Sequence, residues 1–407
     1  MPPAAPTVTL EDILAARQRI SEGVLLTPCP ESLALSRLTG MRIACKLDSL
    51  QRTGSFKERG ARNALLLLDS QARQRGVIAA SAGNHALGLA YHGSTLGIPV
   101  TVVMPRYAPL IKVATCRTFG ARVILAGDTF VAARHAALEL ARTEDLTYIH
   151  GFDNPAIIAG QGTMALEILE QVPDLEAVII PVGGAGLLAG MSVAIKTLRP
   201  EVRVIAVEDD RMPSFTAAIR AGHPVEVPAR PTLADGLAVG KVGELSLALA
   251  LPRYDELLQV SEDELALAIL RLVELEKCVV EGSAAATLAA AVRPELNSLH
   301  GKRVVLVLCG GNIDLTLLGR VLERGQVLAG RLYRFIAIMP DRPGALAHLS
   351  QLIAATGANV RDIEHERAFA DGDLATVHIA CTVETTDTQQ ATNLRESLTA
   401  AGIICQE

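Results

Sequence analysis

The side chain with the clearest chemical potential in this sequence is Lys57. It stands between a turn-forming Thr53-Gly54-Ser55 and a helix-forming run that begins at Glu58. A lysine amine held beside a tight turn can form a Schiff base with pyridoxal phosphate, the cofactor that stabilises carbanions of amino acids. Most lysines next to acidic and basic neighbours on a helix are solvated surface charges. The chemical interpretation of Lys57 therefore depends on three further segments.

The first of these segments is Ser81-Ala82-Gly83-Asn84-His85. It follows an apolar run, residues 76–80, that is typical of a buried parallel strand, and it precedes a helical pattern from Ala86. Small residues at such a junction leave backbone N–H groups free at the positive end of the helix dipole, which suits a carboxylate. We expect Asn84 to add a donor to the phenolic oxygen of the cofactor. The competing interpretation is an ordinary Ser or Asn helix cap.

The second segment is Gly183-Gly184-Ala185-Gly186-Leu187, between an apolar strand at 177–182 and a helix at 188–194. Glycines let the backbone turn tightly and approach a phosphate, with the helix start facing the anion. The spacing does not match the dinucleotide fingerprint, and no acidic residue follows at the ribose distance. We therefore predict a phosphate cradle here, and the alternative is a packing turn.

The third segment, Cys309-Gly310-Gly311-Asn312, ends the strand-like run 303–308. A small polar residue at the carboxyl end of a buried strand faces the crevice in which α/β proteins bind ligands. Cys309 is thus a candidate weak hydrogen-bond donor to the pyridine nitrogen, although most free cysteines are buried structural thiols.

Together the four segments resemble the fold-type II pyridoxal-phosphate enzymes, and within them the threonine dehydratases (threonine ammonia-lyases), with the related serine dehydratases and serine racemases. The resemblance covers nearly the whole chain and includes the later segments 232–239 and 280–286. It implies that Lys57 carries the cofactor as an internal Schiff base. The cofactor-binding residues implied are Phe56, Lys57, Asn84, Gly183, Gly184, Ala185, Gly186, Leu187 and Cys309.

The same resemblance implies a catalytic role for Lys57 and Ser81. The residues that it implies for the substrate carboxylate are Ser81, Ala82, Gly83, Asn84 and His85. Two positions depart from the common pattern of the family. Ala185 stands where many relatives have glycine, and Cys309 stands where many have serine.

Bulk composition limits the classes of function. Half of the 407 residues are hydrophobic, 3% are aromatic and none is tryptophan, so the core must be built from Ala, Val, Leu and Ile, as in a parallel α/β sheet. A net charge of −6 without basic clusters argues against nucleic-acid binding. No apolar run is long enough to cross a membrane, and residues 1–6 lack the pattern of a signal peptide. We expect a cytoplasmic protein.

The cysteines support the same expectation about the compartment. They are odd in number, scattered, and free of Cys-x-x-Cys pairs, which disfavours a disulfide framework or a zinc site. Their positions are Cys29, Cys45, Cys116, Cys278, Cys309, Cys381 and Cys405.

Alternating strand-like and helical runs predict an α/β fold with doubly wound parallel sheets up to about residue 325. Further strand-like runs lie at 100–104, 121–125 and 202–207, and clear helices at 129–142 and 262–276. The resemblance divides this catalytic domain, 1–325, into a larger lobe and a smaller one, roughly 55–150, with the cofactor between them.

The pattern changes after a break at residues 325–330. We predict strands at 332–339, 359–366, 374–383 and 403–405, helices at 345–356 and 386–400, and a hairpin turn at 370–373. This βαββαβ order is the ferredoxin-like topology. With its Asp341-Arg342-Pro343-Gly344 loop, the segment 331–407 looks like an ACT domain, a regulatory module that commonly binds amino acids. Candidate effector contacts are Pro343, Gly344 and Asn359, and the alternative is a dimerisation module without a ligand.

The resemblance implies a lyase that converts L-threonine to 2-oxobutanoate and ammonia, with some activity on L-serine. Because 2-oxobutanoate leads towards isoleucine, we expect isoleucine or valine as effector and a homo-oligomer, dimer or tetramer, as the assembly. Serine dehydratase or serine racemase is the alternative within this fold, and an amino-acid sensor with a vestigial catalytic domain is the alternative of another class. Some relatives bind a divalent cation, for which Glu208 or Asp209 is the candidate ligand here.

Overall fold

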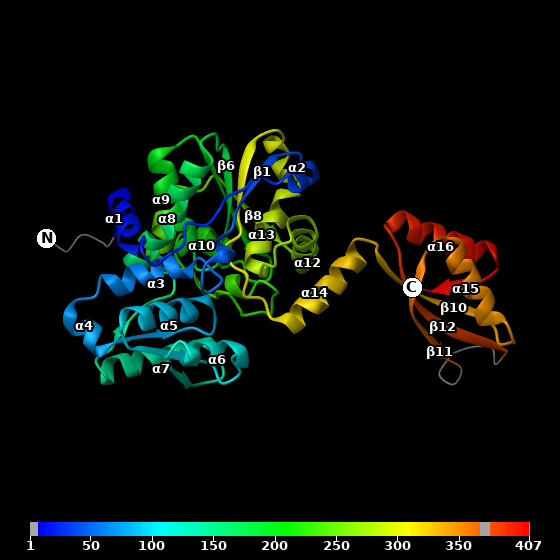
Figure 1. Cartoon of the computed structure of the whole chain (residues 1–407), viewed down its shortest axis with the longest axis horizontal. Coiled ribbons are helices and arrows are strands. Elements are labelled where there is room, and N and C mark those ends of the chain that lie inside the picture. Colours follow the sequence, from blue (N-terminus) through cyan, green and yellow to red (C-terminus); the bar gives the residue numbers. More distant parts are fainter. Residues whose placement is uncertain (1–6, 367–374, 407) are drawn as a thin grey trace. The chain divides into compact units, whose positions relative to one another are not determined.

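The computed structural model describes residues 7–366 and 375–406 (Figure 1). The chain divides into two compact units, Met1–Ile313 and Asp314–Glu407. Each unit is described by itself below.

The larger sheet of the first unit has five strands in the order β1-β9-β6-β7-β8, and all neighbouring pairs are parallel. Its strands are almost entirely buried and rich in Val, Ile and Ala, as expected for a parallel sheet covered on both faces. Their bounds are β1 (Arg42–Lys46), β6 (Ala177–Pro181), β7 (Arg203–Asp209), β8 (Glu256–Val260) and β9 (Arg303–Val307).

The smaller sheet has four strands in the order β4-β3-β2-β5, again all parallel. The bounds are β2 (Val77–Ala80), β3 (Val100–Met104), β4 (Arg122–Leu125) and β5 (Thr147–Tyr148). In Figure 1 its helices α5 (Asn84–Leu96), α6 (Leu110–Thr118) and α7 (Phe130–Thr143) gather in one lobe. The predicted doubly wound α/β fold is therefore confirmed, with a small sheet inside the range proposed for the smaller lobe.

Helix α3 (Lys57–Leu66) packs on α5 of the smaller lobe and on α8 (Pro155–Gln171). Glycines allow the contact with α8 to be very close, because a Cβ on Gly60 would lie 2.9 Å from the carbonyl oxygen of Ile157. A Cβ on Gly160 would lie 2.6 Å from the Cα of Gly60. Backbone packs on backbone here, so the distance between the two helices is fixed.

The remaining helices of this unit cover the sheets and connect the strands. They are α1 (Leu10–Ile20), α2 (Leu33–Thr39), α4 (Ser70–Arg75), α9 (Gly186–Leu198), α10 (Ser214–Ala221), α11 (Glu244–Ala250), α12 (Glu262–Arg271) and α13 (Gly282–Ala291), with short helical turns η1 (Asp48–Leu50), η2 (Asp235–Leu237), η3 (Leu272–Glu276) and η4 (Pro294–Leu299). The helix predicted over 262–276 is α12 followed by η3, a π-helical turn that ends at Lys277 in the left-handed conformation.

The second unit begins with α14 (Leu315–Leu328), so the predicted break at 325–330 lies in the end of a helix and the turn after it. It continues with β10 (Leu332–Pro340), α15 (Ala345–Ala355), β11 (Asn359–Glu366), β12 (Thr376–Glu384), α16 (Thr388–Ala400) and β13 (Ile404–Gln406). The sheet is antiparallel in the order β11-β12-β10-β13. The predicted βαββαβ order is confirmed, while the hairpin turn predicted at 370–373 lies outside the described residues.

Within residues 7–366 and 375–406, no helix is both long enough and apolar enough to span a membrane.

Candidate active site

Lys57 is the first residue of α3, and the chain just before it is anchored to the segment that follows β9. Ser55 and Gly310 form an antiparallel bridge, and the Phe56 N–H donates to the Cys309 carbonyl at 2.9 Å. Two loops far apart in the sequence are thereby held side by side. The predicted cofactor lysine and the predicted ring-nitrogen partner come from these two loops.

Lys57 is half-buried, and its amine donates to the carbonyl of Gly151 at 2.9 Å. Burial lowers its pKa from the ordinary 10.5 to about 8, an effect that Cys309 and Glu281 oppose. An amine with this pKa is partly unprotonated near neutral pH, which is what a nucleophile or a base requires.

The predicted cofactor-binding residues line one cavity. Phe56, Lys57, Asn84, Cys309 and all five residues of the loop 183–187 lie in its wall. Phe152 and Pro181 also lie in the wall. Gly236, Leu237, Glu281 and Ser283 complete it, and these four come from the segments 232–239 and 280–286, to which the resemblance extended without giving a site role. The cavity measures about 40 Å³.

The glycine loop has the shape of an anion cradle. Ala185 adopts φ +68°, and α9 begins directly after it with no side-chain cap on its N-terminal amides. A Cβ on Gly184 would lie 2.3 Å from the Phe152 ring, and a Cβ on Gly186 would lie 2.6 Å from the Phe152 carbonyl. Uncapped amides at the start of a 13-residue helix attract an anion. The departure at Ala185 thus costs about 1–2 kcal/mol of backbone strain without closing the loop.

The loop predicted to hold the substrate carboxylate joins β2 to α5. The cap position of α5 is Gly83, which makes no side-chain cap hydrogen bond, and the Ser81 hydroxyl accepts from the Gly83 N–H at 3.2 Å. The competing interpretation, an ordinary Ser or Asn cap, does not describe this helix start. Its first-turn amides are therefore left for an anion.

His85 is buried at the same loop, with Nε2 3.2 Å from the carbonyl of Ile149. Burial and, after it, the nearby Lys57 lower the pKa of its ring to about 3, so the imidazole is neutral. Within the part of the chain that the structure describes, its Nδ1 has no hydrogen-bond partner. With Nε2 donating to the carbonyl, Nδ1 presents a lone pair to this region of the site.

Glu281 lies in the segment 280–286 of the resemblance, but no site role was predicted for it. The Asn84 amide donates to both of its carboxylate oxygens, at 2.8 and 3.0 Å, and the Ser283 hydroxyl donates at 2.6 Å. Burial, followed by the charge of Asp235, raises the pKa of Glu281. An acid at the N-cap position of α13, directly before Gly282, was the available signal, but it reads as an ordinary cap. The contact predicted between Asn84 and the cofactor stays a prediction.

The thiol of Cys309 is 2% exposed and lies in the wall of this cavity. Burial and the charge of Glu281 raise its pKa far above the ordinary value, so the thiol stays neutral. A neutral weak donor is what the sequence predicted for the residue facing a pyridine nitrogen. That orientation is a prediction.

The candidate metal ligand Glu208 has other partners. Its carboxylate accepts from the backbone N–H groups of Phe215 and Thr216, at 3.0 and 3.1 Å, and from Gln259 at 3.2 Å. It therefore caps α10. Among residues 7–366 and 375–406, no group of three or more His, Cys, Asp and Glu side chains is arranged to hold a metal ion.

The structure does not bring the candidate effector residues together within one chain. The loop with Pro343 and Gly344 follows Pro340, which pairs with Thr376 at the start of β12, whereas Asn359 pairs with Glu384 at the other end of β12. Gly344 has φ +90° and precedes α15, which has no side-chain cap, and the Asn359 amide donates to Glu384 at 3.0 Å. A cavity of about 660 Å³ in this unit is lined by other residues, including Arg334, Arg361 and Arg395. The roles of Pro343, Gly344 and Asn359 stay predictions.

The first unit has two parallel α/β sheets. Lys57, the uncapped glycine loop 183–187 and the neutral thiol of Cys309 line one cavity, and these groups suit pyridoxal phosphate. This combination defines a pyridoxal-phosphate enzyme of fold type II. A family model described as "Pyridoxal-phosphate dependent enzyme" matches residues 20–310, and an "ACT domain" model matches residues 333–402. The chain belongs to the pyridoxal-phosphate-dependent enzymes and is a lyase of that family with a C-terminal ACT domain.

Similar proteins agree with this assignment. The L-threonine ammonia-lyase of Thermotoga maritima is 44% identical over 397 residues, which are 97% of this chain and 98% of that protein. The structure of the processed form of threonine deaminase isoform 2 from Solanum lycopersicum has 36% identity and a TM-score of 0.75, over 79% of this chain and 91% of that one. The serine racemase from Dictyostelium discoideum has 36% identity and a TM-score of 0.72, over 76% and 100%.

Proposed function

We propose that this enzyme dehydrates and deaminates L-threonine to 2-oxobutanoate and ammonia, with lower activity on L-serine. The observation that carries the proposal is that Lys57 and the glycine loop lie in one cavity. The pKa of the Lys57 amine, about 8, leaves that amine partly unprotonated. The similarity to L-threonine ammonia-lyase over nearly the whole length of both proteins supports threonine as substrate.

Lys57 is proposed to hold the cofactor and then to move the proton. When bound, pyridoxal phosphate supplies an electron sink for the bond that breaks at Cα. Released by the incoming amino acid, the Nζ atom of Lys57 takes the Cα proton as a general base. At pH 7.5 an amine of pKa about 8 is roughly one quarter unprotonated, against roughly 0.1% for an ordinary lysine.

The uncapped start of α5 is proposed to orient the substrate. In this proposal the backbone N–H groups of the loop 81–85 bind the carboxylate, and the hydroxyl of Ser81 assists proton transfer beside it. Neutral His85 adds no charge of its own, so the positive end of the helix dipole sets the preference for an anion.

Cys309 is proposed to face the ring nitrogen as a neutral group. Because burial keeps its thiol protonated, it supplies no negative charge that would hold that nitrogen protonated. Such a neutral partner would favour elimination, in which the β-hydroxyl takes up a proton and leaves as water, over transamination. The enamine that leaves the site tautomerises and hydrolyses, so threonine yields 2-oxobutanoate and ammonia.

The ACT domain is proposed to regulate this reaction by binding an amino acid. The uncapped start of α15 after Gly344 suits a carboxylate, and Asn359 begins β11, the strand that follows the other end of α15. A branched-chain amino acid, isoleucine or valine, is the proposed ligand, and the proposed assembly is a homo-oligomer.

The test is a visible absorbance spectrum of the purified protein followed by 2-oxo-acid assays with threonine, serine and 3-hydroxyaspartate. We expect the absorbance of covalently held cofactor, and the highest kcat/KM with threonine. The similarity to a serine racemase makes serine the rival substrate. Chiral analysis after incubation with L-serine distinguishes the rivals: D-serine as the main product would overturn the proposal of a threonine lyase.

A further inference from the structure

Four charged side chains form a buried network around Arg59, which is two residues after Lys57 on α3. Lys46 ends β1, Asp48 begins η1, Arg59 lies in the first turn of α3 and Glu167 lies on α8. The side chains of Lys46, Asp48 and Arg59 are 0% exposed and that of Glu167 is 9% exposed. Two positive and two negative charges balance, so the cluster is neutral as a whole.

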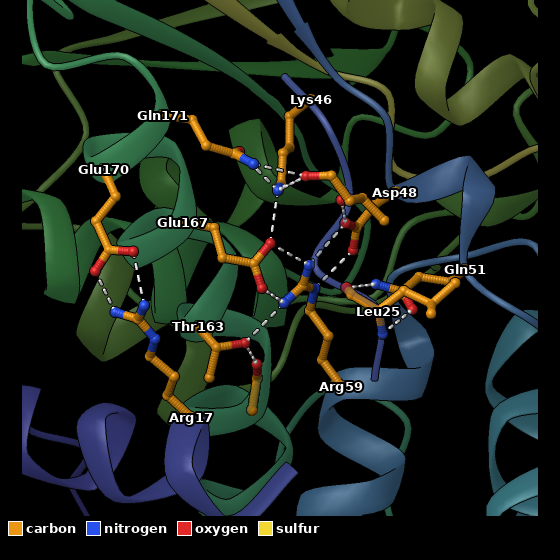
Figure 2. A network of polar contacts seen from close by, with 12 residues as sticks. Arg17, Leu25, Lys46, Asp48, Gln51, Arg59, Thr163, Glu167, Glu170 and Gln171 are labelled. Atoms are coloured by element: carbon orange, nitrogen blue, oxygen red, sulfur yellow. Dashed lines mark hydrogen bonds and ion pairs between the residues drawn. The ribbon is translucent and has the colours of Figure 1, made fainter. Parts of the chain in front are cut away.

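Arg59 is at the centre of this network, between Asp48 and Glu167 (Figure 2). Its guanidinium donates twice to Asp48, at 2.7 and 2.8 Å, and twice to Glu167, at 2.6 and 2.8 Å. The fifth N–H donates to the hydroxyl of Thr163 at 3.1 Å. All five donors of a planar fork are used, which fixes both the position and the plane of the group.

Lys46 completes the network on its other side. Its ammonium donates to Glu167 at 2.6 Å, to the carbonyl of Thr27 at 2.6 Å and to Gln171 at 3.0 Å. The hydroxyl of Thr27 in turn donates to Asp48 at 2.6 Å. Every charged group therefore has several partners. The neighbouring segments η1 and α3 meet α8, which is distant in the sequence, in one hydrogen-bonded cluster.

Stability alone does not account for such a cluster. A buried ion network that replaces apolar side chains is commonly neutral or unfavourable for stability, because the charges must leave water. A specific arrangement is what such a network provides when all of its members are satisfied. Its place in the fold indicates which arrangement is being specified.

The network acts on the same two helices that place the Lys57 amine. Arg59 is two residues after Lys57 on α3, and the carbonyl of Gly151, which accepts from the Lys57 amine, lies just before α8. The glycine contact between Gly60 and Gly160 fixes how close the two helices lie. It does not fix their rotation or axial shift, and the fork of Arg59 locks both.

We infer that Arg59, clamped between Asp48 and Glu167, is a positioning residue that sets where the amine of Lys57 lies in the active site. The inference rests on the proposed role of Lys57. It gives the network a part in the reaction although none of its members lines the cavity.

The chain provides a matched pair of variants on one helix. Glu167→Gln removes a charge from the network, and Glu170→Gln removes the partner of Arg17 one turn further along α8. The Arg17–Glu170 pair is also bidentate, but its side chains are 40% and 57% exposed (Figure 2). Both substitutions make the same chemical change, carboxylate to amide, on the same helix. The two sites differ in burial and in whether the side chain is bonded to α3.

For the holoenzyme at 25 °C, well below its thermal midpoint, we expect Glu167→Gln to lower kcat about tenfold or more. KM for threonine should change less than about threefold, since α5 binds the carboxylate. The cofactor absorbance maximum should shift, and the rate at which cofactor-free protein takes up pyridoxal phosphate should fall. Glu170→Gln should leave all of these at the wild-type values.

A purely structural network would give a different result. Glu167→Gln would then lower the thermal midpoint while kcat, the absorbance maximum and the uptake rate at 25 °C stay at wild type, and that result overturns the inference. If Glu167→Gln does not fold, the pair Thr163→Val and Thr163→Ser tests the inference. A lower kcat and a spectral shift in the valine variant, with a normal serine variant, would support it. Two normal variants would overturn it. Borohydride attachment to Lys57 in the wild type tests the proposed function separately.

Discussion

Gly186→Ala is the perturbation whose effect on cofactor binding follows most directly from the structure. The added Cβ would lie 2.6 Å from the carbonyl oxygen of Phe152, whereas ordinary contacts begin at 3.4 Å. Backbone must therefore move by about 0.8 Å, either in the loop at Phe152 or at the start of α9. Such overpacking costs about 1–3 kcal/mol of stability.

The same movement changes the proposed phosphate cradle. Loss of one hydrogen bond to a charged group costs about 1.5–3 kcal/mol, which corresponds to about a tenfold to hundredfold weaker binding of pyridoxal phosphate. The assay is a titration of cofactor-free protein with pyridoxal phosphate, followed by absorbance. Gly319→Ala on α14 is the control, because a Cβ there meets no atom within 4 Å.

The control should bind the cofactor normally and gain about 0.5–1 kcal/mol of stability, as expected for Gly to Ala in a helix. Wild-type affinity in Gly186→Ala, together with a lowered thermal midpoint, would refute the assignment of this loop as the phosphate cradle. The loop would then be the packing turn that the sequence left open.

Three further predictions concern the amine, the thiol and the regulatory domain. The rate at which cofactor-free protein combines with pyridoxal phosphate should rise about tenfold per pH unit and level off near pH 8, since burial lowers the pKa of Lys57 to about 8; a rate that keeps rising through pH 10 contradicts that pKa. Cys309→Ser should keep most of the activity, whereas Cys309→Asp should shift the cofactor spectrum and slow elimination, and equal activity of the two variants would mean that residue 309 does not face the ring. In the full-length enzyme, isoleucine or valine should raise the apparent KM for threonine with a coupling free energy of about 1–3 kcal/mol. The variant Asn359→Ala should weaken that response and leave the basal kcat unchanged. If neither amino acid alters the kinetics, only an assembly role is left for residues 331–407.

The fold could be predicted from sequence because its signals are local. Apolar runs of four to seven residues mark six parallel strands, β2, β3, β4, β6, β7 and β9, and the change of pattern after residue 330 marks the second domain. The strands β1, β5 and β8 were not predicted. The predicted limit at 325 stays a prediction, and α14 shows why it is hard to place: Gly325 reads as a breaker but is buried within a helix. When tertiary packing stabilises a helix around a glycine, the local sequence does not indicate that the helix continues through it.

The site was predictable where its residues end strands or begin helices. Lys57, Asn84, the loop 183–187 and Cys309 all occupy such positions and line one cavity. Gly151 was not predictable, because it contributes a carbonyl that any residue would supply. Sequence offers no signal for a backbone acceptor.

The buried charges were missed for a different reason. Arg59 and Glu167 are 108 residues apart, and each is an ordinary charge on a helix until the two helices pack. Glu281 and Asn84 are 197 residues apart, and the acid occupies an N-cap position. Charged side chains are usually solvated, so only the tertiary structure distinguishes these from surface residues.

The central claim is that Lys57 holds the cofactor. Borohydride reduction of the holoenzyme, followed by digestion and mass spectrometry, locates the lysine that carries the reduced cofactor. We predict attachment at Lys57, and loss of both the attachment and the cofactor absorbance in a correctly folded Lys57→Ala variant. Attachment at any other lysine would contradict it.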